Sequence, residues 1–283
     1  MKTESPVLPI FVRWTWTGYQ ARKVWETRVR RVMQAWPQIE IASVSEGLRA
    51  CTFLRTPPQD VPVLRKMLNR QGLIVAQCPA TSPVPLKAST KAEYHSMDVV
   101  IGSEENAALF INACERHDHD EIGRMLGYPE CCRKFYLTVC AEQKHIDTVW
   151  QAAGNTRNGS QTPLKTLIET EGDPKANMIL HKMNLKAVPH LPCSFDCSET
   201  AIMADQFADL GKRIGYKDEM EWLHEILSWP MEWSALHGIA EIKLPVFKMI
   251  TNTDVTSDMR VVRRISSVFP EEGARGLTFP YNQ

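Results

Sequence analysis

The chain has 283 residues, of which 43% are hydrophobic and 23% are charged, values that are ordinary for a globular protein. No apolar run approaches the ~20 residues of a membrane-spanning helix, which excludes functions inside a membrane. The N-terminus lacks the apolar core of a signal peptide, so we expect a cytoplasmic protein. The length exceeds what one core usually serves and favours two domains.

Charge is unevenly spread along the chain, although the formal net charge is zero. Residues 1–78 carry twelve Lys and Arg against five Asp and Glu, a balance of +7. The remaining residues carry 21 against 28, a balance of −7. This asymmetry favours two modules and indicates an anionic partner for the first, which we expect to be a small molecule, a carrier or a nucleic acid.

The first module is predicted to alternate strands and helices. In chain order, the pattern predicts a strand, a helix closed by Pro37, two strands of a hairpin, a helix and a strand, over residues 9–15, 19–35, 39–44, 48–55, 60–69 and 73–76. The order β-α-β-β-α-β is the ferredoxin-like arrangement. We therefore expect an α+β protein that begins with a basic ferredoxin-like domain over residues 1–78.

One face of this predicted sheet is rich in aromatic and basic residues. Alternation along the first and third strands places together Phe11, Arg13, Arg49, Cys51, Phe53 and Arg55. If this face is open, its rings can stack on bases among the arginines, or the face can bind another anionic partner. The alternative is a plain docking surface with solvated arginines, because no RNA-binding signature is intact.

The rest of the chain is predicted to form a linker and a second domain. Residues 79–96 are rich in Pro and small polar residues, which is typical of a linker. Residues 97–283 predict a mostly helical α+β domain with a small sheet. Its predicted strands cover residues 98–101, 231–236, 239–250 and 261–268, and its longest predicted helices follow Ser103, Pro129, Asp196 and Asp218.

Two short segments of the second domain concentrate cysteine. One is Gly127-Tyr128-Pro129-Glu130-Cys131-Cys132 and the other runs from His190 to Cys197. A helix that begins at Pro129 puts Cys131 and Cys132 in its first turn, and Asp196 as a cap would do the same for Cys197. The positive end of a helix dipole favours thiolate over thiol.

These segments predict one thiolate site. Thiolates repel one another unless a cation holds them, so we expect a metal bound by Cys131, Cys132, Cys193 and Cys197, with His190 as a further or alternative ligand. Sulfur ligands favour zinc or iron–sulfur chemistry over magnesium or calcium. The spacing matches neither a standard zinc finger nor a complete radical-SAM motif. Reactive dithiols without metal, and cysteines that simply pack in a core, remain open alternatives.

The hexapeptide Gly-Tyr-Pro-Glu-Cys-Cys at 127–132, followed by Arg133 and Phe135, resembles a motif of an uncharacterised prokaryotic family of unknown function. The resemblance covers about a dozen residues, and it implies no activity. The predicted chemistry therefore rests on the residues themselves.

A weaker catalytic candidate lies near residue 240. Glu241 and Lys243 share a face of a predicted strand, and His237 precedes them in a turn. An acid and an amine so placed can transfer protons, whereas the alternative is a structural ion pair. No dinucleotide fingerprint, P-loop, nucleophile elbow or zincin motif is present in the sequence.

The sequence thus favours a metal-dependent oxidoreductase that uses iron or an iron–sulfur cluster on a small or carrier-bound substrate. Two alternatives stay open. The first is a zinc-stabilised module that binds nucleic acid or peptide, and the second is a metal-free thiol oxidoreductase or sulfur carrier that uses the same cysteines.

Overall fold

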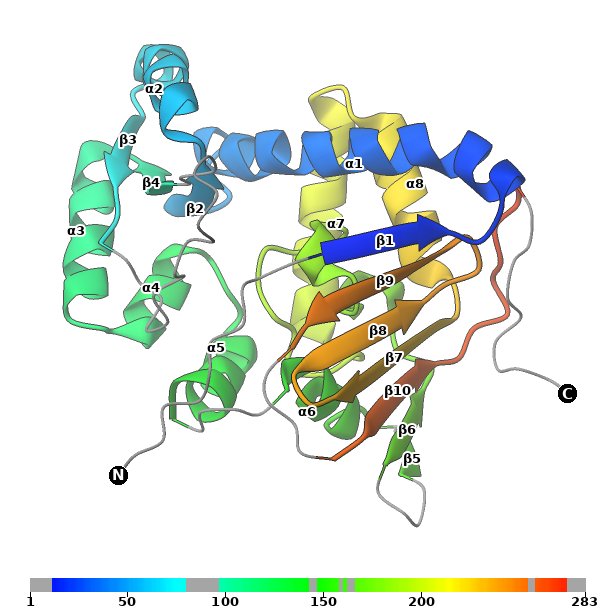
Figure 1. Ribbon diagram of the computed structural model, residues 1–283. Helices are drawn as coiled ribbons and strands as arrows, with labels where there is room; N and C mark the ends of the chain where they lie inside the picture. The colour runs from blue at the N-terminus through cyan, green and yellow to red at the C-terminus, as the bar shows by residue number, and fades with distance from the viewer. Residues whose placement is uncertain are drawn as a thin grey trace, which may run out of the picture. The chain divides into compact units, whose positions relative to one another are not determined.

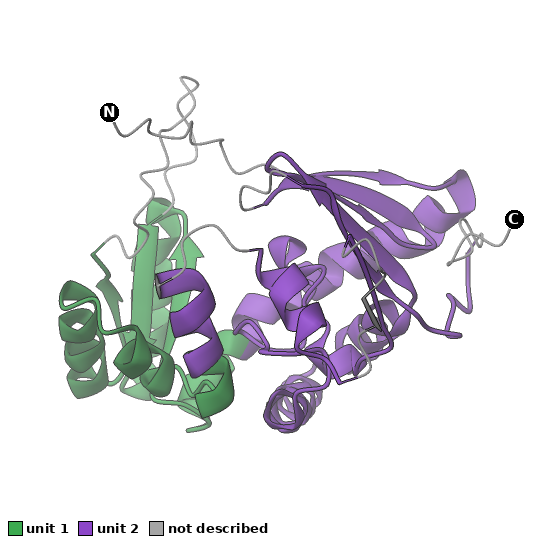
Figure 2. Cartoon of the chain, turned by 90° about the horizontal axis from the view of Figure 1, so that it is seen from below, with its two compact units in different colours: residues 1–10, 40–133 green, residues 11–39, 134–283 purple. Residues whose placement is uncertain are grey.

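The computed structural model describes residues 12–79, 97–142, 147–157, 160–161, 166–253 and 258–273. These residues form a mixed α+β structure with two sheets (Figure 1). The chain divides into two compact units (Figure 2). The first unit comprises residues 1–10 and 40–133, and the second comprises residues 11–39 and 134–283. The divisions fall inside helices α1 (Tyr19–Ser45) and α5 (Glu130–Tyr136).

The first unit is built on a three-stranded antiparallel sheet. Its strand order is β2 (Cys51–Thr56), β4 (Met97–Gly102), β3 (Ile74–Gln77). Its helices are the last turns of α1 together with α2 (Val61–Leu68), α3 (Glu104–Glu115) and α4 (His119–Met125).

Both faces of this small sheet are buried. Val99 and Ile101 of β4 pack with residues of α1 and α2, whereas Val100 between them packs with α3 and α4. Alternating side chains of one strand therefore enter two separate hydrophobic clusters, as the period of two in a strand requires.

Most of the predicted aromatic and basic face is accordingly not an open surface, although Arg55 is exposed and is paired with Asp98 at 2.8 Å. Cys51 is fully buried, and the ring of Phe53 stacks on Phe110 of α3 with the ring centroids 6.2 Å apart. Arg49 is 6% exposed. Phe11 lies outside the described residues, and its neighbour Arg13 belongs to a different sheet.

The second unit contains a seven-stranded sheet, larger than the small sheet we expected. Its strand order is β1 (Val12–Trp16), β9 (Phe247–Asn252), β8 (Ile239–Lys243), β7 (Met231–Leu236), β10 (Arg260–Arg264), β6 (Leu167–Thr170), β5 (Ser160–Gln161). All neighbours are antiparallel except β10 and β6. Along these strands buried apolar residues alternate with charged ones, so one face belongs to the core and the other is polar.

The helices of this unit are the first part of α1 with α6 (Thr148–Gly154), α7 (Ser198–Arg213) and α8 (Lys217–Ser228). Helix α5 continues as a π-helix over Leu137–Glu142. Within the described residues, no helix combines the length and the apolar character needed to cross a membrane.

The ferredoxin-like arrangement is not confirmed, for two reasons. Strand β1 pairs with β9 in the large sheet and not with the strands of the first unit. Residues 39–44, predicted as a strand, belong to helix α1. The sheet of the first unit takes its third strand from residues 97–102, beyond the expected linker, most of which lies outside the described residues.

Helix α1 runs through Pro37 because burial outweighs the cost of the proline. A proline inside a helix costs about 3 kcal/mol. Trp36 and Ile39 flank it and are 1% and 0% exposed, and burying each such side chain contributes roughly 1.5–3 kcal/mol. They extend a fully buried stripe along the helix that begins with Ala21, Trp25, Val29 and Val32.

Candidate metal centre

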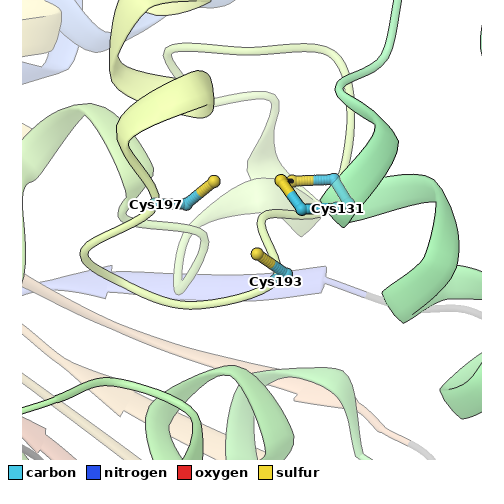
Figure 3. A group of neighbouring side chains, drawn as sticks. Cys131, Cys193 and Cys197 are labelled. Carbon is cyan, nitrogen blue, oxygen red and sulfur yellow. Dashed lines mark hydrogen bonds between the residues drawn. The ribbon is translucent and has the colours of Figure 1, made fainter.

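The four cysteines of the two segments lie together. The sulfur atoms of Cys131, Cys132, Cys193 and Cys197 are all within 4.8 Å of one another. Figure 3 shows the sulfurs of Cys131, Cys193 and Cys197 turned toward one another. Cys132 and Cys197 are buried, Cys193 is half-buried and Cys131 is exposed. The sequence thus identified a group of thiols that can hold a metal ion.

A helix-ending motif positions the first pair. Helix α4 stops at Gly127, which has a positive φ of 74°. The N–H of Tyr128 donates to the carbonyl of Gly123 and the N–H of Gly127 donates to that of Arg124, which is the Schellman pattern. The chain then turns at Pro129 into α5, and Cys131 and Cys132 occupy its first turn as predicted.

Arg133 stabilises this turn through hydrogen bonds, a role that the sequence did not indicate. Its Nε donates to Asp120 of α4 at 2.8 Å, and its Nη1 donates to the carbonyl of Tyr128 at 2.9 Å. A Cβ at Gly123 would lie 2.8 Å from Arg133 Cδ, so any larger residue there would displace the arginine side chain. The arginine next to Cys132 therefore fixes the angle between α4 and α5.

Hydrogen bonds to the backbone hold the loop that carries the second pair. Asn155 Nδ2 donates to the carbonyl of Cys193 at 2.9 Å, and the N–H of Phe195 donates to Thr156 Oγ1 at 3.0 Å. The N–H of Asp173 donates to the carbonyl of Phe195 at 2.6 Å. These contacts come from two other segments, so the loop is held from both sides independently of any metal.

The predicted capping role of Asp196 is wrong. The N-cap of α7 is Cys197, and no side-chain cap is present. The carboxylate of Asp196 instead accepts hydrogen bonds from Ser194 Oγ at 2.7 Å and from Arg157 Nε at 3.0 Å. Burial opposes the change, but these donors lower the pKa of Asp196. Asp196 thus shapes the loop, and Cys197 lies one position earlier than expected, immediately before the first turn.

His190 does not belong to the group of four sulfurs. It is 7% exposed, and its Nε2 lies 2.9 Å from Thr200 Oγ1. Thr200 occupies the third position of α7, three residues after Cys197. The imidazole therefore links the segment before Cys193 to the helix after Cys197, a contact that no spacing rule predicts.

Three of the other described cysteines fit the core interpretation, whereas Cys140 is half-buried. Cys51, Cys78 and Cys114 are buried in one hydrophobic cluster of the first unit. Burial raises the pKa of the Cys51 thiol to about 11, against an opposing effect of Arg49. Cys51 is thus a neutral thiol at physiological pH, the opposite of a metal-binding thiolate.

The predicted catalytic residues lie on the polar face of the large sheet. Lys243 Nζ is 3.7 Å from Glu241 and 3.4 Å from Glu232 on the neighbouring strand β7. Glu232 is also paired with Arg263 of β10 at 3.0 Å. His237 is exposed in the β7–β8 turn, with a φ of 50°. The structure therefore places Glu241 and Lys243 in a ladder of ion pairs across adjacent strands.

Comparison of the chain with protein-family models, with curated proteins and with solved structures gives no significant match.

Proposed function

We propose that this protein is a metalloprotein whose four clustered thiolates hold a single metal ion. The spacing of the sulfurs carries this proposal. Four sulfurs at the usual metal–sulfur distance of about 2.3 Å stand about 3.8 Å apart in a tetrahedron. The sulfurs of Cys131 and Cys132 are 3.9 Å apart, and all four lie within 4.8 Å.

The same spacing favours one ion over the iron–sulfur cluster that the sequence suggested. In a four-iron cluster each thiolate binds a different iron, which holds the thiolate sulfurs farther apart than on a single ion. Sulfurs in near contact, such as those of Cys131 and Cys132, suit two ligands of one ion.

Zinc is the ion that this ligand set supports best. Four protein thiolates complete a tetrahedral shell and leave no position for water or substrate, which is the pattern of structural zinc sites. In this function the ion stabilises the fold by fixing the start of α5 to the loop before α7. The protein is then a zinc-stabilised binding protein, and its binding site lies elsewhere in the molecule.

A redox function with iron is the second candidate, and the exposure of two sulfurs favours it. Cys131 is exposed and Cys193 is half-buried, so a partner can approach within electron-transfer distance of the ion. A single iron held by four thiolates would exchange one electron without changing its ligands. Such a centre would serve an oxidoreductase that acts on a small or carrier-bound substrate.

Anaerobic purification with metal analysis and a visible spectrum tests both candidates. We expect one metal ion per chain. A colourless protein with one zinc supports the structural function, and a coloured protein with one iron and no labile sulfide supports the redox function. A cluster with labile sulfide, or a folded protein without metal after purification in the presence of zinc and iron, would refute the single-ion proposal.

A further inference from the structure

The second unit contains a cavity of about 330 Å³ that does not involve the cysteines. It is formed by α7, α8, the short helix Pro174–Ala176 and Trp36 of α1. Its volume is near the lower end of the range of roughly 300–1,000 Å³ for small-molecule sites, so its ligand is small.

Apolar side chains form most of its wall. Helix α7 contributes Ala204 and Ala208, one turn apart on the same face. Because both side chains are small, the space beside α7 stays open. Helix α8 contributes Met220, Leu223 and Leu227. This wall suits an aliphatic or thioether chain.

Trp36 supplies a hydrogen-bond donor beside this wall. Its side chain lines the cavity and is 1% exposed, and its ring stacks on Phe207 with the centroids 5.7 Å apart. The buried indole Nε1–H has no acceptor among the described residues. A buried donor without an acceptor is unfavourable, so a small turn of the ring that brings this N–H to an oxygen atom of a ligand would stabilise it.

Two charges of opposite sign at the cavity are only loosely paired. Lys212 lies 3.8 Å from Asp209, and Glu221 lies 3.8 Å from Lys217. Neither Asp209 nor Lys217 lines the cavity. By contrast, a third lining residue, Lys175, is bound tightly to Asp205 at 2.7 Å. One cation and one anion therefore remain able to turn toward a ligand.

We propose that this cavity binds a small apolar zwitterion, an α-amino acid with an apolar side chain. Lys212 binds its carboxylate and Glu221 its ammonium group. The Trp36 Nε1–H donates to a carboxylate oxygen, and the side chain packs against the alanines of α7 and the apolar residues of α8. An uncharged apolar molecule would leave the donor unsatisfied, and a simple carboxylate or amine would use only one of the two charges.

This proposal is independent of the metal centre. The cavity shares no residue with the cysteine site, so either proposal can fail while the other holds.

Isothermal titration calorimetry with the full chain tests which class of ligand binds. L-leucine, L-methionine and L-phenylalanine are compared with 4-methylpentanoate, which lacks the ammonium group, and with 3-methylbutylamine, which lacks the carboxylate. We expect saturable one-to-one binding of at least one amino acid, and binding at least tenfold weaker for both analogues.

Variants locate the site. Lys212→Gln and Glu221→Gln should each weaken binding at least tenfold, and Ala208→Leu should abolish it by filling the cavity. Lys248→Gln on the polar face of the sheet and Glu115→Gln in α3 are charge-matched controls that should bind as the unmodified chain does. If Ala208→Leu does not fold, as judged by circular dichroism, the two charge variants still show whether the amino acid binds in this cavity.

The indole resonance of Trp36 gives a direct readout. In a spectrum of the tryptophan Nε1–H groups, the peak absent from Trp36→Phe identifies this residue. We expect a downfield shift of that peak on addition of the amino acid. Equal binding of an analogue, binding unaffected by both charge variants, or no binding of any amino acid would overturn the proposal.

Discussion

The Nε2 atom of His190 lies 2.9 Å from the hydroxyl oxygen of Thr200, inside the protein. His190 precedes Cys193 by three residues, and Thr200 follows Cys197 by three. One hydrogen bond thus closes the loop that presents two of the four sulfurs. Partners that orient ligands in this way often matter nearly as much for metal affinity as the ligands themselves.

Removing the hydroxyl group of Thr200 should weaken metal binding without removing a ligand. We expect Thr200→Val to lower zinc affinity about tenfold and to keep one ion per chain, because only the orientation of the loop suffers. Competition with a chromophoric chelator measures the affinity. Thr200→Ser retains the hydroxyl group and is the control. A cobalt spectrum of mixed sulfur and nitrogen ligation in the unmodified chain, which loses its nitrogen contribution in His190→Phe, would instead identify His190 as a ligand.

Substitution of a ligand should remove the metal altogether. We expect Cys193→Ser to bind less than 0.1 equivalent of zinc, because a serine hydroxyl stays protonated and is a poor ligand for this ion. The melting temperature should fall with the lost binding energy. Cys114→Ser is the matched control, since Cys114 is buried outside the group of four. Retention of a full equivalent of metal by Cys193→Ser would contradict the proposed ligand set.

Local signals explain why the cysteine site was predictable. Gly127 and Pro129 mark the end of one helix and the start of another, and such signals depend on a few neighbouring residues. The partners of the loop at 190–197 were not predictable, because Asn155 and Thr156 bond to backbone atoms about forty residues away. Neither residue type carries a signal for such a contact.

The first module was mispredicted where long-range packing decides the structure. Pro37 indicates the end of a helix locally, but α1 continues through it because the residues on both sides are buried. Strand β1 was correctly expected near residue 12, yet its partner β9 lies more than 230 residues away. Sequence pattern predicts that a strand exists, but its neighbours depend on the whole fold.

The excess of positive charge in the first 78 residues is also partly compensated by the fold. Arg31 lies 2.6 Å from Glu219, and Arg28 lies 2.7 Å from Glu272. These acids come from the segment with the opposite balance. Charge counted along the sequence therefore overstates the basic character of the surface that α1 presents.

Arg49 should stabilise the fold from the inside. Its guanidinium group donates to Ser43 Oγ at 2.6 Å, to Thr52 Oγ1 at 2.7 Å and to the carbonyl of Glu40 at 3.0 Å. We expect Arg49→Met to lower the free energy of unfolding by ~2 kcal/mol, because buried acceptors lose their donors. Urea unfolding of both chains measures this difference in the free energy of unfolding. Arg70→Met, at an exposed arginine of the same unit, should change it by less than ~0.5 kcal/mol.

Stability should fall in mild acid because of His181. Burial lowers the pKa of this imidazole to about 4, and its Nδ1–H donates to the carbonyl of Met178. In the unfolded chain the pKa is about 6.5. Between these two values the unfolded chain binds a proton that the folded protein does not, so stability decreases as the pH falls through this window.

His181→Asn retains a donor for Met178 and removes the titration. Its free energy of unfolding should therefore depend less steeply on pH between 6.5 and 4 than that of the unmodified chain, as urea unfolding at several pH values would show. His237→Asn, at an exposed histidine, is the control. An unchanged slope in His181→Asn would contradict this assignment.

The ion-pair ladder on the large sheet should be structural, with Arg263 as its central cation. Glu232 is 7% exposed and is paired with both Arg263 and Lys243, whereas Glu241 at the end of the ladder is 36% exposed in its side chain. Arg263→Met leaves a buried carboxylate with one close cation fewer, and we expect it to cost ~1–2 kcal/mol. Glu241→Gln removes an exposed pair and should cost less than ~0.5 kcal/mol.

Urea unfolding at low and high salt separates these effects, because salt screens the exposed pair more than the buried one. The cost of Glu241→Gln should vanish in 1 M salt, where the Debye length is about 3 Å, while most of the cost of Arg263→Met remains. A larger loss of stability for Glu241→Gln than for Arg263→Met would reverse this order.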